Sequence, residues 1–473
     1  MSDMEPTSIL DHMQFSWLDD TKNHLEQQLE RRGALDEIQY GQLLADALAG
    51  SCGQFIFCHG EFWAYIPKTG LYVPVRTVKI QNLLYDLHNT KGHEGLLHKL
   101  SKNKISNIVS IAANYLTNDH FFDEAPLGLA TEDSYLLLSE NKIEVKDHSP
   151  QYRARWKVSA PFSGLTEPDE TASKIAEMVG GTENAQTFFE VLGVAMFGLG
   201  TRFSRALVFV GEGANGKSTL VNIMCQMIPA YMRSSVPLNA LKTEYDRVQL
   251  DGKILNTLEE LPALSLIDVQ LVKNIITGGA IQARQIGNAA FTMYPKAQHI
   301  ICTNQLPLMH ENNEALRRRF IVIRLNQTIP EDRRDLDFAQ KFFNEHKAAL
   351  LLLAVRALEE ALKRGRIYEP NTSKLEVARW LDRNDVVTSF IKECVEQTGN
   401  PKDRIPVDEM LEACIRYANM HGFPPPSSPR QFGTRMEAAG FVRGKSSTKY
   451  WVAVRFTKDT GEDRENLTTP PPA

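Results

Sequence analysis

The sequence lacks several features that would assign it to other classes of protein. Its six cysteines are scattered and form no C-x-x-C pair, so we expect reduced thiols. Cys52 and Cys58 resemble a metal-binding pair, but no second pair of ligands follows them, which favours core thiols. No apolar run approaches the roughly 18 residues of a membrane span, and the acidic N-terminus has no apolar signal core. We therefore expect a cytoplasmic protein with no membrane partner.

A large positive charge is also absent, because the net charge of the chain is −5. This excludes a protein that coats nucleic acid through its overall charge. Residues 427–456 nevertheless hold six basic side chains and one acidic side chain, Glu437. The basic residues are Arg430, Arg435, Arg443, Lys445, Lys449 and Arg455. This local excess indicates a nucleic-acid surface, with a solvated basic face as the alternative.

The most informative motif is a phosphate-binding loop, G-x-x-x-x-G-K-S, which starts at Gly211. A strand-like run precedes it at 206–210, and a helix-like run follows at 220–224. Lys217 can reach the outer phosphates of a nucleotide, and the Ser218 hydroxyl can ligate magnesium. We assign the nucleotide contacts to Gly211, Gly213, Asn215, Gly216, Lys217, Ser218 and Thr219. The motif predicts a nucleoside triphosphatase but not the use of the energy.

Two acidic residues follow the next apolar stretch. The run from Leu250 is expected to form a strand that ends at Glu259 and Glu260. One carboxylate would hold magnesium, together with Ser218, and the other would polarise the attacking water. Paired surface glutamates are the alternative interpretation.

A third strand, 297–304, ends at Asn304, just before Pro307. Asn304 would orient the attacking water beside the γ-phosphate; an asparagine that caps a turn is the alternative. Three arginines then lead into an apolar run at 320–323. An arginine offered to a neighbouring subunit's nucleotide would stabilise charge in the transition state. A basic strand edge is the alternative for Arg317. We expect Lys217, Glu259, Glu260, Asn304, Arg318 and Arg319 to be the catalytic set.

The sequence of the C-terminal part predicts two helices followed by a basic hairpin. Residues 407–420 have helical spacing, and a second helix is expected to start with Ser428 as N-cap and Pro429 in its first position. Strands are expected at 441–443 and 449–454. This order is that of a winged helix, in which the second helix enters a groove of DNA and Arg443, Lys445 and Lys449 contact phosphates. A protein-binding winged helix is the alternative.

Together these motifs resemble superfamily 3 helicases, and more closely the phage and plasmid primase-helicase family that includes the poxvirus primase-helicase. The loop 211–219 matches that family's asparagine-bearing phosphate loop. The acidic motif is similar, with Glu260 a better match than Glu259 to the family's single acid. The segments 271–284 and 301–307 and the paired arginines are also similar.

The resemblance implies an α/β fold with an AAA+-type P-loop ATPase core, an α+β N-terminal domain and a C-terminal winged helix. We expect an N-terminal domain at 1–165, a helical collar with the ATPase core at 166–335 and a helical segment at 336–380. The winged helix would occupy 381–456 and a disordered tail 457–473. In residues 54–75 the aromatics would pack a small β-meander or stack on bases.

The sequence departs from the family at two places. An acid usually follows Thr-Gly-Gly, where this chain has Ala280. The tip of the hairpin that tracks DNA often carries lysine, and here it reads Gly287-Asn288. Arg284 or Lys296 would substitute, or the backbone at Gly287 would approach DNA closely. No clustered Asp-x-Asp motif precedes the core, so we expect no primer synthesis by this chain.

The resulting expectation is an ATP- and magnesium-dependent DNA helicase for replication of a phage, plasmid or other mobile element. The resemblance implies a homo-hexameric ring that moves 3′→5′ on single-stranded DNA and works with a separate primase. We assign DNA contacts to Arg284, Gly287, Asn288, Lys296, Arg430, Arg435, Arg443, Lys445 and Lys449. One alternative is an initiator that recognises duplex origin DNA and loads itself. Another is a DNA-binding switch or defence-related ATPase that does not unwind; a small-molecule kinase leaves the winged helix without a role.

Overall fold

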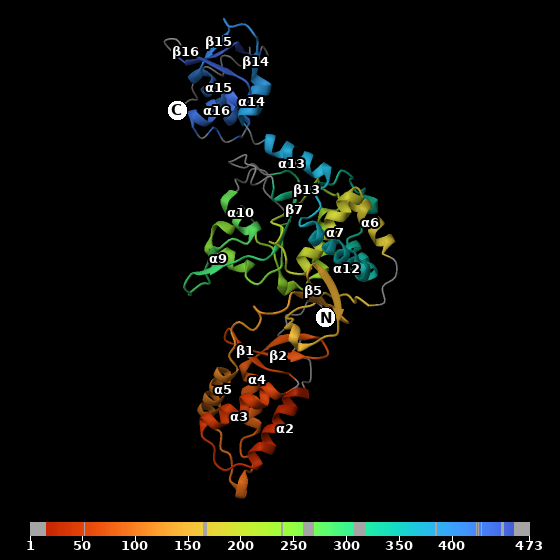
Figure 1. Cartoon of the computed structure of the whole chain (residues 1–473), viewed down its shortest axis with the longest axis vertical. Helices are drawn as coiled ribbons and strands as arrows, with labels where there is room; N and C mark the ends of the chain where they lie inside the picture. Colours follow the sequence, from red (N-terminus) through yellow and green to blue (C-terminus); the bar gives the residue numbers. More distant parts are fainter. Residues whose placement is uncertain are drawn as a thin grey trace.

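A computed structural model provides the structure of the chain. It describes residues 16–51, 53–163, 168–237, 240–258, 269–306, 318–383, 386–421, 423, 425–426, 428–445 and 449–457. The chain forms three units along its long axis: an N-terminal unit, a central unit with a parallel sheet, and a C-terminal unit (Figure 1). None of the helices in these ranges is long and apolar enough to span a bilayer.

In the part of the N-terminal unit that the structure describes, four helices pack against a small antiparallel meander. The helices are α2 (Ser16–Glu30), α3 (Glu37–Gly50), α4 (Thr77–Asp86) and α5 (Lys102–Leu116), and the strands are β1 (Ile56–Cys58), β2 (Glu61–Ile66) and β3 (Leu71–Val75). A capping box at Asp36 and Gln39 starts α3. The aromatic rings of Trp63 and Tyr72 contact Phe122. These aromatics therefore pack the sheet, which disfavours base stacking.

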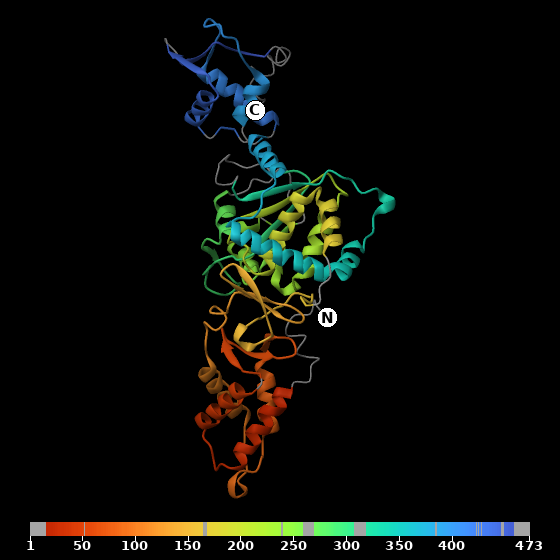
Figure 2. The ribbon, with the colours of Figure 1, turned by 45° about the vertical axis from the view of Figure 1, so that its right-hand side comes forward.

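A second antiparallel sheet joins the N-terminal and central units. It contains β4 (Gly128–Ala130), β5 (Tyr135–Ser139) and β6 (Lys142–Lys146). Because neighbouring strand residues face opposite sides, Tyr135 packs into the N-terminal core while Leu136 packs into the central core. The Ile143 backbone N–H donates to Glu359 of α12 at 2.8 Å. The sheet lies between the two units in Figure 2.

Three helices cover one side of the central sheet: α6 (Asp169–Val179), α7 (Thr182–Met196) and α12 (Phe338–Arg364). Helices α7 and α12 approach closely, since a Cβ at Gly193 would lie 2.4 Å from the Ala354 carbonyl oxygen. The fully buried Glu190 carboxylate accepts from the Arg364 guanidinium at 2.7 Å and from the Tyr368 backbone N–H at 2.6 Å. These contacts fix α7 against the chain that follows α12.

The central sheet has five parallel strands in the order β13-β7-β12-β9-β8. They are β7 (Ala206–Val210), β8 (Arg233–Ser234), β9 (Leu255–Leu258), β12 (Gln298–Thr303) and β13 (Phe320–Arg324). Strand β9 begins later than the predicted start near Leu250, because Val248–Leu250 form a 3-10 turn and Gly252 has a φ of 68°. Both faces of β7 are buried, as its apolar sequence predicts.

Further elements surround this sheet. They are α8 (Lys217–Met227), α9 (Glu244–Arg247), α10 (Val269–Thr277), the hairpin β10 (Ile281–Ala283) and β11 (Phe291–Met293), and α13 (Asn371–Arg383). Helix α13 covers the edge strand β13: the Val322 N–H donates to the Ser373 hydroxyl at 2.9 Å, and Arg324 pairs with Glu376 at 2.7 Å. Helix α13 then leads to the C-terminal unit (Figure 1).

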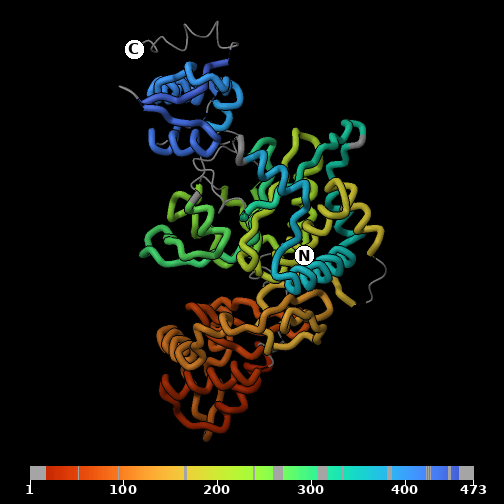
Figure 3. Tube along the Cα trace, turned by 45° about the horizontal axis from the view of Figure 1, so that its top comes forward, coloured from red at the N-terminus to blue at the C-terminus, as the bar shows by residue number. Residues whose placement is uncertain are grey.

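The C-terminal unit contains three helices and two small sheets. Its elements are α14 (Val386–Cys394), β14 (Val395–Gln397), β15 (Arg404–Pro406), α15 (Val407–His421), α16 (Pro429–Ala438), β16 (Val442–Lys445), β17 (Lys449–Val452) and β18 (Val454–Phe456). The Ser428 hydroxyl accepts from the Gln431 N–H and caps α16, as predicted. The predicted single strand 449–454 is instead broken at Ala453, whose φ is 55°. Figure 3 shows the compact packing of this unit.

Candidate nucleotide site and DNA interface

The loop 211–216 connects β7 to α8, so that the predicted strand and helix flank it. Gly213, Ala214 and Gly216 have positive φ angles of 41°, 51° and 83°. This left-handed backbone curls the loop, and α8 begins at Lys217 directly after Gly216. The N-terminus of α8 therefore faces the space enclosed by the loop, where free N–H groups and the helix dipole favour an anion. Ser218 is exposed in the first turn of α8.

Lys217 and Asn215 form a buried network inside this loop. The Lys217 ammonium donates to the Gly211 carbonyl at 2.6 Å and to Asn215 Oδ1 at 2.9 Å. The Asn215 amide in turn donates to the Leu325 carbonyl at 3.1 Å. Burial lowers the pKa of Lys217. The Asn215 side-chain amide is thus oriented with its oxygen towards Lys217. This oxygen is a neutral acceptor that phosphate oxygens can replace.

Close packing explains the glycine at the start of the loop. A Cβ on Gly211 would lie 1.8 Å from the Asn215 amide nitrogen and 2.7 Å from the Leu325 carbonyl oxygen. The Gly211 N–H donates to the Thr303 carbonyl at 3.3 Å. Any side chain at this position would displace Asn215 and, with it, the acceptor of Lys217.

Asn304 lies beside the beginning of the loop. The parallel register pairs Thr303 with Val210, so the residues that follow them, Asn304 and Gly211, emerge at the same edge of the sheet. The Thr303 hydroxyl donates to the Gln305 carbonyl, which closes a turn and leaves Asn304 exposed. The structure therefore brings Asn304 to the edge of the sheet at which the loop lies. Glu259, Glu260 and Arg317 lie outside the described residues; β9 is described to Leu258, which pairs with Ile301.

Arg318 and Arg319 lie at the opposite edge of the sheet. Phe320, the next residue, pairs with Ala206 at the start of β7, and the Ala206 N–H donates to the Arg319 carbonyl at 2.7 Å. The loop follows the other end of β7, and a five-residue strand spans roughly 16 Å. These arginines are therefore too far from the loop of their own chain to act on a nucleotide there. Burial, with a smaller contribution from Arg318, lowers the pKa of Arg319.

The hairpin of β10 and β11 presents an apolar tip. Ile286 is 90% exposed, and Gly287 has a φ of 83°. Asn288 is held by its own turn, since its N–H and side-chain amide donate to the Gln285 carbonyl and side chain. Arg284 pairs with Glu244 at 3.5 Å at the base of the tip. Lys296 is exposed but precedes β12, at the sheet edge that carries Arg319.

The basic residues of the C-terminal unit fall into two groups. Arg430 on α16 and Lys445 and Lys449 at the β16–β17 turn are exposed, and Arg435 is half-buried on α16. Arg443 instead pairs with Glu437 at 3.0 Å and lies over the Trp451 ring at 5.0 Å. A Cβ at Gly433 would collide with its guanidinium. Arg443 thus joins α16 to the sheet, a role that the sequence analysis did not predict.

The segment after β13 also contacts the loop, which the sequence motifs do not predict. The Leu325 carbonyl accepts a hydrogen bond from the Asn215 amide, and the Ile329 N–H donates to the Ala214 carbonyl at 2.7 Å. The segment then extends away from the central unit, where Leu336 is fully exposed (Figure 2). No motif marks these backbone contacts, because carbonyl and N–H groups belong to every residue.

Comparisons with known proteins give limited matches. A family model described as a family of unknown function, DUF5906, matches residues 209–319, from β7 to Arg319. No curated protein matches. Similar solved structures include two apo forms of the NrS-1 C-terminal region (305–718). They have 15% and 14% identity and TM-scores of 0.46 and 0.45, and each covers 89% of this chain and all of that one. A third NrS-1 structure has 14% identity and a TM-score of 0.39, with 70% and 96% covered. Scores this low carry no inference about function.

Proposed function

We propose that the protein is an ATP-dependent DNA helicase that acts in replication of a phage, plasmid or other mobile element. The observation that carries the proposal is the placement of the motifs on one parallel sheet. The phosphate loop follows β7 and Asn304 follows the neighbouring β12, and the parallel order β13-β7-β12-β9-β8 supports an AAA+-type core.

The loop residues account for nucleotide binding. A triphosphate in the loop would draw Lys217 from the Gly211 carbonyl and Asn215 towards its outer oxygens. The Ser218 hydroxyl would hold magnesium, which neutralises phosphate charge during transfer. Asn304 would position the attacking water. Glu259 and Glu260 remain the proposed carboxylates for water activation and magnesium.

The position of the arginines supports a ring. Since Arg318 and Arg319 lie a strand's length from the loop of their own chain, an arginine that reaches a nucleotide must come from a second copy. We propose a homo-oligomer with ATP between subunits, and the resemblance to superfamily 3 suggests a hexamer with 3′→5′ movement.

The C-terminal unit supports binding to DNA. The order α14, β14, β15, α15, α16, β16, β17 supports a winged helix, in which α16 would be the recognition helix. The exposed Arg430, Lys445 and Lys449 suit phosphate contacts. Origin recognition by this unit would make the protein self-loading.

One specific observation favours a second candidate, a DNA-dependent ATPase that does not unwind. Among the described residues of the hairpin tip, Arg284 is paired with Glu244 and the apolar Ile286 is 90% exposed, so a free cation for single-stranded DNA is missing there. A contact between the Gly287 backbone and DNA would still allow the hairpin to act in a helicase. Without such a contact, ATP hydrolysis would change the conformation of the protein but would not separate DNA strands.

Two assays on the purified full chain test the proposal. We expect single-stranded DNA to stimulate ATP hydrolysis, and a forked duplex to be separated in an ATP-dependent way. Lys217→Ala should abolish both activities and leave duplex binding within about twofold, because Lys217 lies in the central unit. Hydrolysis without strand separation would select the switch, and a folded protein without hydrolysis would overturn both candidates.

A further inference from the structure

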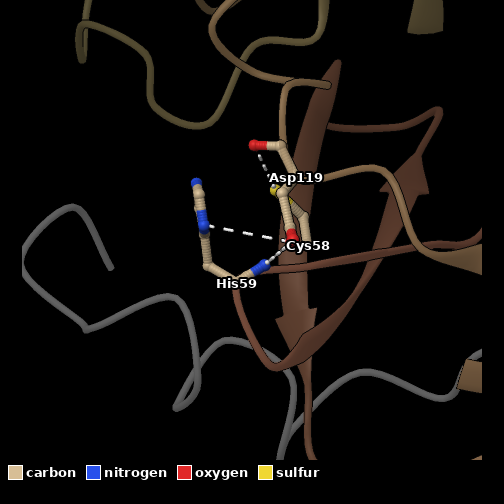
Figure 4. A group of neighbouring side chains, drawn as sticks. All are labelled: Cys58, His59 and Asp119. Atoms are coloured by element: carbon tan, nitrogen blue, oxygen red, sulfur yellow. Dashed lines mark hydrogen bonds and ion pairs between the residues drawn. The ribbon is translucent and has the colours of Figure 1, made fainter. Parts of the chain in front are cut away.

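Three side chains of different ligand types meet in the N-terminal unit. Cys58 ends β1, His59 and Gly60 form the turn to β2 with φ angles of 50° and 84°, and Asp119 lies in the loop after α5. Figure 4 shows the three side chains next to one another. The Cys58 sulfur, a His59 ring nitrogen and an Asp119 carboxylate oxygen all lie within 4.8 Å of one another. The sequence analysis treated Cys58 only as a core thiol or as a partner of Cys52, which lies outside the described residues.

Backbone contacts hold the two segments together. The His59 N–H donates to Asp119 Oδ1 at 2.8 Å, and the Asn118 N–H donates to the Phe57 carbonyl at 2.9 Å. The thiol of Cys58 is buried and points at the Asp119 carbonyl, 3.7 Å away. The position of the sulfur is therefore set by the fold, whereas the exposed side chains of His59 and Asp119 are able to rotate.

We propose that Cys58, His59 and Asp119 bind one zinc-class divalent cation, with the fourth position taken by water. Thiolate, imidazole and carboxylate are the protein ligands of zinc, and the sulfur disfavours magnesium and calcium. Bond lengths of about 2.0–2.3 Å require ligand atoms roughly 3.3–3.8 Å apart in a tetrahedron. The 4.0 Å between His59 Nδ1 and Asp119 Oδ1 needs only a small rotation to reach that range.

The charge around the cluster is compatible with a cation. Within the described residues, the ion pair of the Asp119 carboxylate is with His59, a ligand itself, and not with a lysine or arginine. The Asp119 carboxylate therefore supplies a negative charge that a divalent cation would compensate.

A second cluster of similar composition provides a contrast. Glu170, Glu345 and His346 also lie close together. There the Lys174 ammonium is 2.8 Å from Glu170 and 3.0 Å from His346 Nε2, while the Thr171 hydroxyl bonds His346 Nδ1. A lysine already occupies the position of a cation, so we assign no metal to that cluster.

Metal at Cys58 would join the β1–β2 hairpin to the loop after α5. The hairpin is short, with β1 only three residues long, and its turn is exposed. A bound ion would add ligand bonds between segments about 60 residues apart. The ion would therefore hold these two segments of the N-terminal unit together and keep one position open to water.

Cobalt(II) titration of the metal-free full chain tests the proposal, because a thiolate ligand produces a sulfur-to-cobalt absorption band. We expect one cobalt per chain at micromolar concentration, displaced by an equal amount of zinc. Asp119→Asn keeps the acceptor for the His59 N–H but removes the charge, so its metal-free melting temperature should match the wild type. It should bind at least tenfold more weakly, and Cys58→Ser should lose the band.

Cys394→Ser is the matched control, because this half-buried thiol belongs to the C-terminal unit. It should keep the band and the affinity. Absence of a sulfur-to-cobalt band, binding only at millimolar metal, or an unchanged band in Cys58→Ser would overturn the proposal. An unchanged affinity in folded Asp119→Asn would remove Asp119 from the ligand set and equally contradict it.

Discussion

Lys217 and Arg319 lie at opposite edges of the same parallel sheet, one after the C-terminal end of β7 and the other before the start of the neighbouring β13. Both residues belong to the proposed catalytic set, but within one chain they are separated by the length of a strand of the sheet. The two side chains can meet at one nucleotide only when they come from different copies of the chain.

This separation predicts complementation between inactive variants. Lys217→Ala and Arg319→Ala should each lose hydrolysis by a factor of about 10³ or more. When the two are mixed, Arg319 of the first variant faces an intact loop on the second, so ATPase activity should reappear. Phosphate release during titration of one variant with the other measures it, and Arg318→Ala repeats the test for the neighbouring arginine.

The matched control is a mixture of Lys217→Ala with Asn304→Ala. These residues serve the same loop from the same chain, so neither variant can repair the other and activity should stay absent. No rescue with either arginine variant would contradict the assignment of the arginines to the neighbouring subunit. Rescue in the control mixture would contradict the proposal that Asn304 serves the loop of its own chain.

Asn215 is expected to stabilise the loop as well as its lysine. Asn215→Ala removes the donor to the Leu325 carbonyl and the acceptor of Lys217, so unfolding should cost about 1–3 kcal/mol less. Thermal melts without nucleotide measure this loss, and the KM for ATP should rise. Glu212→Ala, an exposed change in the same loop, should leave the melting temperature unchanged. Equal melting of both variants would show that the network contributes no stability.

Substitution of Arg443 and of Lys445 should affect different properties, stability and DNA binding respectively, although both are basic residues of β16. Arg443→Ala removes an ion pair and a cation–π contact, which lowers the stability of the C-terminal unit by about 1 kcal/mol. Lys445→Ala should leave the melting temperature unchanged and reduce the slope of log affinity against log salt by about one. Fluorescence anisotropy with duplex DNA at several salt concentrations decides this, and an unchanged slope would remove Lys445 from the interface.

Stability should fall on acidification because of a buried histidine. Burial lowers the pKa of His299 to about 4 from the ordinary 6.5, and its Nδ1 lies 3.3 Å from the Asn256 amide nitrogen. As the pH falls, the unfolded chain takes up this proton before the folded chain does. The free energy of unfolding therefore decreases between about pH 6.5 and about pH 4, by at most about 3 kcal/mol. Urea unfolding at several pH values measures it. In His299→Asn, which keeps an acceptor for Asn256, this part of the slope should vanish.

The sequence predicted the loop, the strand before it and the ends of α16 well, because these depend on local chemistry: glycines that adopt left-handed backbone, an apolar run buried on both faces, and Ser428 followed by Pro429. It misplaced the start of β9 because the turn at Gly252 interrupts an apolar run. It also could not separate Arg443 from Lys445. Their difference depends on Trp451 and Glu437, whose positions follow only from the packing of α16 on the sheet.

The hydrogen bond from the Asn215 side-chain amide to the Leu325 carbonyl connects the loop to the end of β13. Its last residue, Arg324, adjoins the carbonyl that holds a chain's own loop, while its first residue, Phe320, adjoins the arginines offered to another chain. We propose that a phosphate that draws Lys217 away from Asn215 also affects β13, a five-residue strand with four buried residues. In a ring, such a strand would couple nucleotide binding at each site to the site of the next subunit, always in the same direction. The subunits would then hydrolyse ATP one after another around the ring.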